Sequence, residues 1–150
     1  MNVDTVSALL SHLEGIPGIG VDVEGVDRFA EPDKRLFTAE ELAYCATQAD
    51  PPESRAGRWC AKEAVFKACA KYLQLTLREI EIRNEASGRP IVLLPSRATE
   101  VGLMAEVSIA HAGGAAVAVA IAVMQERPTV GRLEQRLEET QLGGSEEVFL

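Results

Sequence analysis

Apolar residues recur every three or four positions in some parts of the chain and alternate with polar residues in others. The first spacing is typical of an amphipathic helix and the second of a half-buried strand. The helical spacing predicts helices over 2–14, from 38 to a break at 48–53, over 54–73 and over 130–139, with shorter helical turns at 25–30 and 96–103. The alternating spacing predicts strands at 19–23, 80–82, 91–93 and 106–111.

Local signals set the limits of the predicted helices. Thr38, with Glu41 three residues later, forms a capping box, which marks the start of a helix. Pro51 and Pro52 predict a break before the long helix, because proline interrupts a helix interior. Ser54 is then expected to cap that helix.

One further strand is predicted from Ala115 to Met124, which are almost all small apolar residues. Such a run predicts a central strand that is covered on both faces. Residues 85–90, which include Gly88 and Pro90, predict a hairpin turn between two other strands. Together these elements predict an α+β fold in which a long helix packs on an antiparallel sheet.

The chain of 150 residues is long enough for one domain with its own hydrophobic core. We expect that domain to occupy residues 1–125, with 1–15 as an N-terminal extension. Residues 126–150 form an acidic C-terminal extension. We expect this extension to be partly ordered up to Glu139 and disordered after it, serving as a packing helix, a docking segment or an appendage.

Composition and charge exclude several classes of protein. The formal net charge of −8 argues against binding to nucleic acid, which attracts basic proteins. No apolar run is long enough to cross a bilayer, and the acidic N-terminus does not resemble a signal peptide. The three cysteines lack metal-ligand spacing. Their odd number, with two on the predicted long helix, predicts free thiols in a reducing compartment such as the cytoplasm.

Polar residues that could carry chemistry gather in three places, two at the ends of predicted strands and one on the long helix. They are Asp22 with Glu24, then Lys62, Glu63 and Lys67, and finally Ser108 with His111. Ends of strands and faces of helices are where a layered fold leaves room for a ligand.

Each cluster taken alone has an ordinary interpretation. Glu63 and Lys67 stand four residues apart on one helix face, where ion pairs are common. A histidine before two glycines, such as His111, is typical of a loop. Taken together, carboxylates from different elements suit a hard divalent cation, and the nearby cations suit a diphosphate. The combined pattern therefore predicts group transfer from a pyrophosphate.

Three motifs occur in a fixed order. They are Gly18-Ile-Gly-Val-Asp-Val-Glu24 followed by Arg28-Phe29, then Trp59-Cys-Ala-Lys-Glu-Ala-Val-Phe-Lys-Ala68, and last Val107-Ser-Ile-Ala-His111. They resemble the motifs of 4'-phosphopantetheinyl transferases of the holo-acyl-carrier-protein synthase type. The second motif is especially similar to the transferase domain of fungal fatty acid synthase. The matched region extends from about residue 16 to 123.

The resemblance implies a catalytic set of Asp22, Glu63, Lys67 and His111. Asp22 and Glu63, helped by Glu24, would bind Mg²⁺, and Glu63 or a metal-bound water would take a proton from the acceptor serine. The resemblance also implies which residues bind coenzyme A. Its phosphates would be contacted by Lys62, Lys67, Arg58, Arg55, Ser108 and His111. Its pantetheine arm would lie along the backbone of Gly88 to Pro90. This would transfer 4'-phosphopantetheine to a carrier protein and release 3',5'-adenosine diphosphate.

The resemblance also implies how the protein meets its partners. Arg28 matches a position that contacts an acidic helix of the carrier protein, and small members of the family form homotrimers with sites between subunits. One departure is that 69–73 is expected to continue the helix where relatives carry a glycine-rich turn. The alternative function is a non-catalytic coenzyme A-binding module associated with a fatty acid synthase.

Overall fold

The structure, a computed structural model, describes residues 16–125. Its elements along the chain are β1 (Gly18–Gly25), η1 (Val26–Phe29), α2 (Ala39–Ala46), α3 (Pro51–Cys69), η2 (Leu77–Glu79), β2 (Glu81–Asn84), β3 (Pro90–Leu93), α4 (Ser96–Glu100), β4 (Leu103–Ala112) and β5 (Ala115–Met124). No helix within these residues has the length and apolar character needed to cross a membrane. The helices predicted over 2–14 and 130–139 lie outside the described residues.

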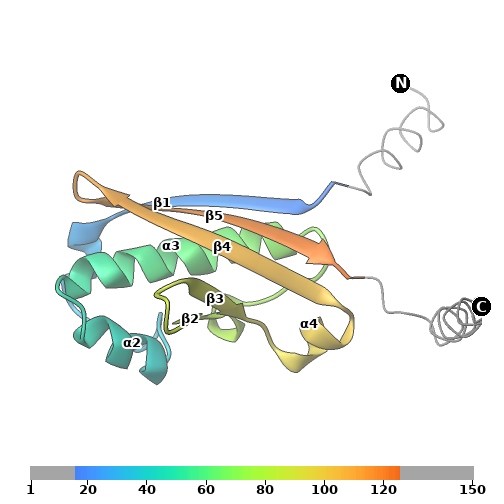
Figure 1. The fold of residues 1–150 in the computed structure, drawn as a ribbon, viewed down its shortest axis with the longest axis horizontal. Coiled ribbons are helices and arrows are strands. Elements are labelled where there is room, and N and C mark those ends of the chain that lie inside the picture. The colour runs from blue at the N-terminus through green and yellow to red at the C-terminus, as the bar shows by residue number, and fades with distance from the viewer. Residues whose placement is uncertain (1–15, 126–150) are drawn as a thin grey trace, which may run out of the picture.

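An antiparallel sheet of order β1-β5-β4 forms one layer, and α3 runs along one face of it (Figure 1). The hairpin β2–β3 forms a separate small sheet below the helix in this view. The prediction of an α+β fold with a long helix on an antiparallel sheet is confirmed. The hairpin predicted around 85–90 is also present.

The core lies between α3 and the inner face of the sheet. Alternate alanines of β5 point toward the helix and are buried: Ala116, Ala118, Ala120 and Ala122. Their short side chains let the helix approach the sheet closely. At one end of the core, Trp59 of α3 contacts Phe37 edge to face, with ring centroids 6.1 Å apart. Phe37 contacts Phe29 in the same way.

Two glycines of β1 bring that strand directly against the backbone of α3. A Cβ atom added at Gly18 or Gly20 would lie less than 3.0 Å from the carbonyl oxygen of Ala68 or Ala64, respectively. Real Cβ atoms do not approach a backbone oxygen so closely, because the repulsion is severe. The absence of side chains at these positions therefore allows the strand and helix to touch.

The start and end of α3 differ from the prediction. Pro51 and Pro52 are the first two residues of the helix, and the carboxylate of Asp50 caps it by accepting a hydrogen bond of 2.9 Å from Glu53 N. Proline is tolerated there because the first N–H groups of a helix have no partner within it. The helix ends at Cys69, so residues 70–72 form a turn rather than the predicted continuation.

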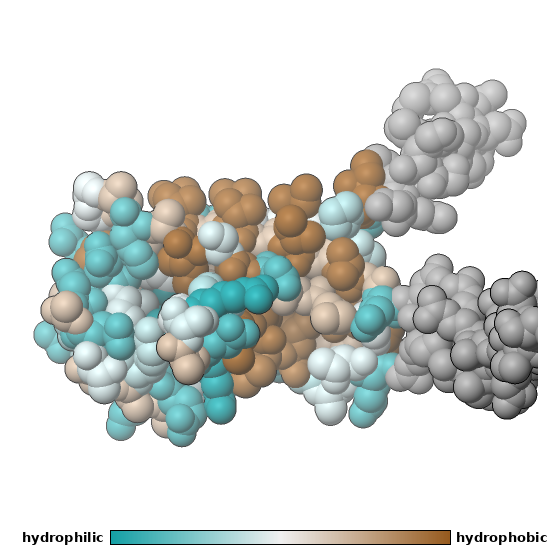
Figure 2. Space-filling model, in the orientation of Figure 1, coloured by the Kyte–Doolittle hydropathy of each residue, from teal (hydrophilic) through white to brown (hydrophobic). Residues whose placement is uncertain are grey.

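The prediction that 115–124 is covered on both faces is wrong for the described chain. β5 is central, but the outer sheet face carries exposed apolar side chains on all three strands: Ile19, Val21, Val23, Met104, Val119, Ile121 and Val123. Apolar side chains are prominent along the sheet in Figure 2. A contiguous apolar face of this kind is typical of an interaction surface.

The close approach of β1 to α3 predicts that Gly20→Ala destabilises the fold. Inserting a methyl group against a backbone oxygen forces the strand away, and we expect unfolding to become easier by about 2 kcal/mol or more. Gly25→Ala is the matched control, because no described atom lies within 4 Å of its Cβ position. Urea denaturation of both variants measures the difference. Equal stability of the two variants would contradict the proposed role of the contact.

Candidate functional site

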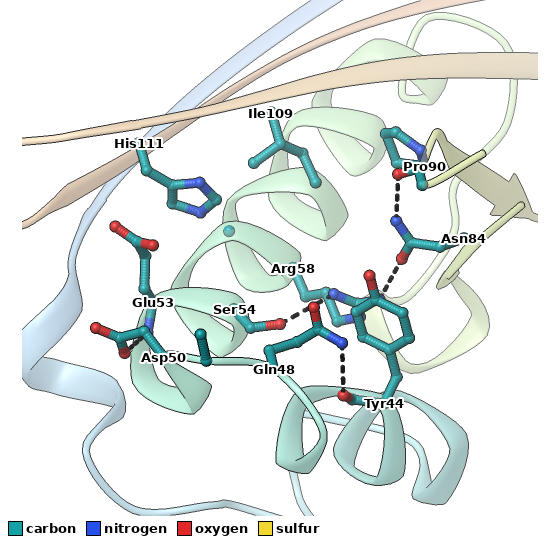
Figure 3. A pocket seen from close by; sticks show the side chains of 13 residues that line it. Tyr44, Gln48, Asp50, Glu53, Ser54, Arg58, Asn84, Pro90, Ile109 and His111 are labelled. Carbon is teal, nitrogen blue, oxygen red and sulfur yellow. Dashed lines mark hydrogen bonds between the residues drawn. The ribbon is translucent and has the colours of Figure 1, made fainter. Parts of the chain in front are cut away.

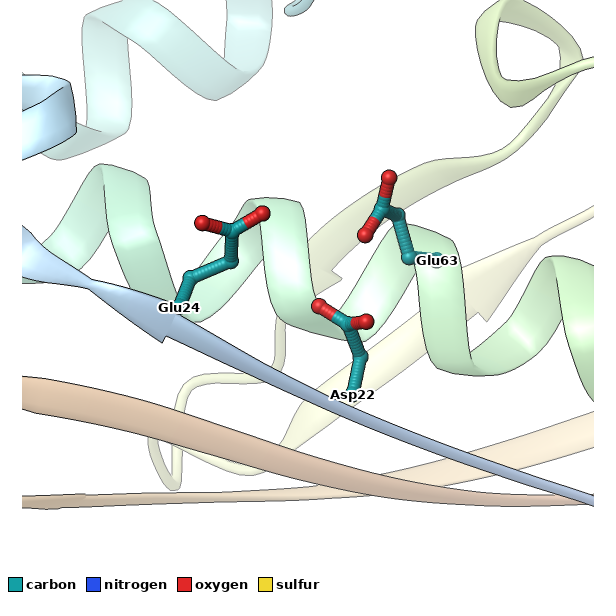
Figure 4. Close-up of side chains that lie close together, drawn as sticks. All are labelled: Asp22, Glu24 and Glu63. Carbon is teal, nitrogen blue, oxygen red and sulfur yellow. The ribbon is translucent and has the colours of Figure 1, made fainter.

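Three carboxylates meet where β1 passes α3. Asp22 and Glu24 stand two residues apart on the strand and therefore point to the same side. Glu63 reaches them from the helix (Figure 4). One oxygen from each side chain lies within 4.8 Å of the others. The strand–helix contact at the preceding glycines is what brings these acids together.

Two cations flank the carboxylates. Lys67, one helical turn after Glu63, donates to Asp22 Oδ1 at 2.8 Å and to the carbonyl oxygen of Val21 at 3.0 Å. Arg28 of η1 forms an ion pair with Glu24. The two cations partly offset the mutual repulsion of the three acids.

Burial raises the pKa of Glu63, and the negative charges of Asp22 and Glu24 raise it further. The second oxygen of Asp22 is buried and has no hydrogen-bond partner within residues 16–125. A buried carboxylate oxygen without a partner is costly, and a cation would satisfy it.

The cluster fits a hard divalent cation such as Mg²⁺. All three side chains offer oxygen atoms, which are the ligands such ions prefer. Their summed negative charge and the unpartnered oxygen of Asp22 both favour a bound cation. The structure thus brings together the three residues that were expected to bind the metal, with Lys67 beside them.

A second cluster lines a cavity of about 380 Å³ between the end of α2, the start of α3, the β2–β3 turn and the end of β4 (Figure 3). Arg58 is the cation of this cavity and is almost fully buried. Its guanidinium group lies 3.9 Å from the centre of the Tyr44 ring and donates to Ser54 Oγ at 3.3 Å. It also donates to Asn84 Oδ1.

The part of this cavity around Arg58 is suited to an anion, whereas the carboxylates of Asp50 and Glu53 line another part of it. Arg58 has a buried Nε without a hydrogen-bond partner in the described part of the chain, and it forms no ion pair there. A buried guanidinium that lacks a carboxylate partner favours a phosphate or another anion. His111, Gly88 and Pro90 line the same cavity, as expected for residues of one site.

The acidic cluster and the cavity lie on opposite flanks of α3. Glu24 of β1 and His111 of β4 both pair with Ala116 of the central strand, so β5 separates them. Cys60 of α3 donates to the carbonyl oxygen of Ala116 at 3.2 Å, which places the helix over the gap. Within one chain, the two clusters therefore face different directions.

Lys62 does not reach either cluster, which corrects the expectation that it contacts phosphate. Its side chain is fully buried and forms an ion pair of 2.9 Å with Glu41. Glu41 also accepts hydrogen bonds from the backbone N–H groups of Thr38 and Ile82. Successive side chains on a helix point about 100° apart. Lys62 therefore faces Glu41 of α2, while Glu63 faces the acids of β1.

Arg55 is likewise placed in a structural role rather than at a phosphate. It is buried and donates to the carbonyl oxygens of Phe29 at 2.8 Å and Ala30 at 2.7 Å. These bonds tie the end of η1 to α3. Arg55 therefore supports the segment that carries Arg28.

Ser108 and His111 were expected to act together, but the strand separates them. Residues three apart on a strand point to opposite faces of the sheet. Ser108 lies on the outer sheet face, in a groove with Met104, Val119 and Ile121. His111 instead lines the cavity beside α3.

Sequence analysis missed Tyr44 and Asn84, the residues that hold the guanidinium of Arg58. Asn84 also donates to the carbonyl oxygen of Gly88 at 2.7 Å and thereby links Arg58 to the turn. The signal was weak, because an asparagine before a turn is ordinary and a tyrosine on a helix is usually part of the core. Their role becomes visible only in the structure, where both residues contact Arg58.

Residues 18–122 match the model of the 4'-phosphopantetheinyl transferase superfamily. The chain is 42% identical over 115 residues to a holo-[acyl-carrier-protein] synthase of Caldicellulosiruptor bescii, covering 69% of this chain and 95% of that protein. It is 38% identical over 129 residues to fatty acid synthase subunit alpha of Candida parapsilosis, covering 78% of this chain but only 7% of that subunit.

Solved structures show the same fold. The acyl carrier protein synthase of Mycobacterium tuberculosis is 33% identical, with a TM-score of 0.59, covering 72% of this chain and 97% of that one. A structure described as the synthase–coenzyme A complex of Chronobacterium ammoniagenes is 26% identical, with a TM-score of 0.61, covering 73% of this chain and 98% of that one. The resemblance inferred from the three motifs is thus confirmed.

The raised pKa of Glu63 predicts that this carboxylate destabilises the metal-free fold. Between the ordinary pKa of a glutamate and the raised pKa of folded Glu63, the folded state keeps this proton while the unfolded state loses it, so stability falls as the pH rises across that interval. In a chelating buffer, urea denaturation from about pH 4 to 7 should therefore show a smaller loss of stability in Glu63→Gln than in the unmodified protein. Parallel curves would contradict this prediction.

Proposed function

The chain belongs to the 4'-phosphopantetheinyl transferase superfamily, and we propose that it transfers the 4'-phosphopantetheine group of coenzyme A to a serine of an acyl carrier protein or carrier domain. The observation that carries this proposal is the meeting of Asp22, Glu24 and Glu63 beside Lys67. Oxygen ligands next to a cation suit a metal-bound diphosphate.

Asp22, Glu24 and Glu63 are the residues that hold Mg²⁺ in this proposal. When bound, the ion supplies positive charge against the diphosphate of coenzyme A. Lys67 lies beside it with half of its side chain exposed. It offers its ammonium group to the same diphosphate and to the charge that develops on the leaving phosphate.

Glu63 takes the proton of the acceptor serine. The serine oxygen then forms a bond to the β-phosphorus, and the bond from that phosphorus to the bridging oxygen breaks. The electron pair leaves with 3',5'-adenosine diphosphate, and the proton passes from Glu63 to solvent.

The cavity around Arg58 binds the remainder of coenzyme A. Its buried guanidinium and the imidazole of His111 face a phosphate, and Gly88 and Pro90 line the path of the pantetheine arm. The cation–π contact with Tyr44 holds Arg58 in place. Lys62 and Arg55 support this site only through the fold.

A homotrimer would unite the acidic cluster of one subunit with the cavity of the next. The two clusters face opposite flanks of α3, so neighbouring subunits could each supply one half of a binding site. The apolar outer sheet face supports self-association, since its exposed valine and isoleucine side chains would then be buried. Ser108, which lies on this face, would approach the subunit boundary.

Arg28 docks the acidic carrier in this proposal. It lies at the edge of the acidic cluster with about half of its side chain exposed, at 54%. A cation there suits an acidic partner and places the acceptor serine near Glu63. The buried free thiols of Cys45, Cys60 and Cys69 support a reducing location such as the cytoplasm.

The alternative is a coenzyme A-binding module that assists a fatty acid synthase without catalysis. The complete set of three carboxylates and Lys67 favours catalysis, because a binding module has no need of a base. The chain matches only a small part of the synthase subunits, so the carrier it serves in the cell stays a proposal.

Transfer requires the metal site, which gives a direct test. Incubation with apo-carrier protein, coenzyme A and Mg²⁺ should add the mass of phosphopantetheine to the carrier serine, as measured by mass spectrometry. A chelator should stop the reaction, and added Mg²⁺ should restore it. Glu63→Gln should lower the rate by about 100-fold or more, because it removes the base.

Glu79→Gln is the control for this experiment, since Glu79 pairs with Arg97 away from the cluster. It should transfer at the rate of the unmodified protein. Absence of any mass gain, with a bacterial carrier and a fungal carrier domain both tried, would overturn the proposed function. Retention of full rate by Glu63→Gln would overturn its assignment alone.

The shared site predicts that two inactive variants restore each other. Mixed trimers of Glu63→Gln and Arg58→Ala contain sites built from two unmodified halves, at about one quarter of the sites if subunits assort at random. The mixture should therefore recover about that share of the transfer rate after joint refolding. If each site lay within one chain, the mixture would be as inactive as either variant.

A further inference from the structure

The imidazole of His111 lies against the backbone of α3 at Gly57. A Cβ atom at residue 57 would lie 2.5 Å from His111 Nε2 and 3.0 Å from His111 Cε1. It would also lie 3.0 Å from Ile109 Cγ2 on the same strand. The imidazole therefore occupies the space that any other residue at position 57 would fill.

Gly57 differs in this respect from the glycines of β1. At Gly18 and Gly20 the obstructing atoms are carbonyl oxygens of the helix, so these glycines serve the packing of the fold. At Gly57 the three nearest atoms all belong to side chains, and the nearest are the outer end of an imidazole. Such an end can rotate away, so an added methyl group would displace His111 rather than the helix.

A glycine in the middle of a helix is otherwise unfavourable, because alanine is the better helix former. Gly57 is buried within α3, where no turn or change of direction requires glycine. The helix thus carries a residue that weakens it at the point where the imidazole rests.

The position of the imidazole matters because Gly57 immediately precedes Arg58. Gly57, Arg58 and His111 all line the same cavity. Figure 3 shows the side chains of Arg58 and His111 in it. His111 is exposed and lies near the end of the β4–β5 hairpin.

We propose that Gly57 is a positioning residue for His111: its missing side chain provides the space that holds the imidazole toward the anion bound by Arg58. This inference rests on the proposed binding of coenzyme A in that cavity. It assigns Gly57 no contact with the ligand. Its effect on binding passes entirely through His111.

Gly57→Ala tests the proposal with two independent measurements. In the unmodified protein, nuclear Overhauser effects should connect the Gly57 Hα protons with the imidazole ring of His111. In Gly57→Ala the His111 ring resonances should shift, while the urea denaturation midpoint should stay the same or rise. The KM for coenzyme A should increase about tenfold, as for loss of one charge-assisted hydrogen bond, with a smaller change in kcat.

His111→Ala supplies the matched background. If Gly57 acts only through the imidazole, then adding Gly57→Ala to His111→Ala should leave the KM for coenzyme A unchanged. An equal increase of KM in both backgrounds would overturn the proposal, because the glycine would then act through the helix or Ile109. Unchanged His111 resonances in Gly57→Ala would overturn it as well.

The two proposals fail in different ways. If the cavity does not bind coenzyme A, then His111→Ala leaves coenzyme A binding unchanged, while the ring resonances still report whether Gly57 holds the imidazole. If the cavity binds coenzyme A but Gly57 has no positioning role, then His111→Ala weakens binding and Gly57→Ala does not.

Discussion

The contact between the backbone of β1 and the backbone of α3 is the constraint on which the candidate site depends. Gly18 and Gly20 allow the strand to lie on the helix without intervening side chains. Alternation along the strand then directs Asp22 and Glu24 to the helix, where Glu63 stands. The local chemistry of a metal site is thus a consequence of two residues that have no side chain.

The close approach of three carboxylates favours binding of a cation but lowers the stability of the metal-free fold. Three carboxylates repel one another, and burial adds to the cost at Glu63, whose pKa is raised. Lys67 and Arg28 offset part of this repulsion through ion pairs with Asp22 and Glu24. A divalent cation and a diphosphate would complete the balance of charge, because the metal neutralises the acids and the lysine meets the phosphate.

The helix α3 divides the polar residues between two flanks while its buried face holds the core. On the flank of β4, Tyr44, Asn84 and Gly57 arrange Arg58 and His111 around one cavity. On the flank of β1 stand the acids. In the proposed trimer, burial of the exposed apolar face of the sheet would stabilise the contact between subunits.

The fold class, the main elements and the members of the acidic cluster were all predictable from the order of residues along the chain. Helical spacing, alternating spacing and the capping box at Thr38 all depend on residues that are close together in the chain, so they can be recognised from the sequence. The predicted start of α3 was wrong. Pro51 and Pro52 were interpreted as a break, because proline disrupts a helix interior, but proline fits the first turn of a helix.

Which charged residues are available to a ligand depends on how the elements pack. Lys62 is a neighbour of Glu63 in the sequence, yet the helix turns it into the core to meet Glu41. Ser108 and His111 share a motif, yet the pleat of β4 sends them to opposite faces. The burial of a side chain and the direction in which it points depend on elements that are distant in the sequence. A local pattern of residues therefore does not predict them.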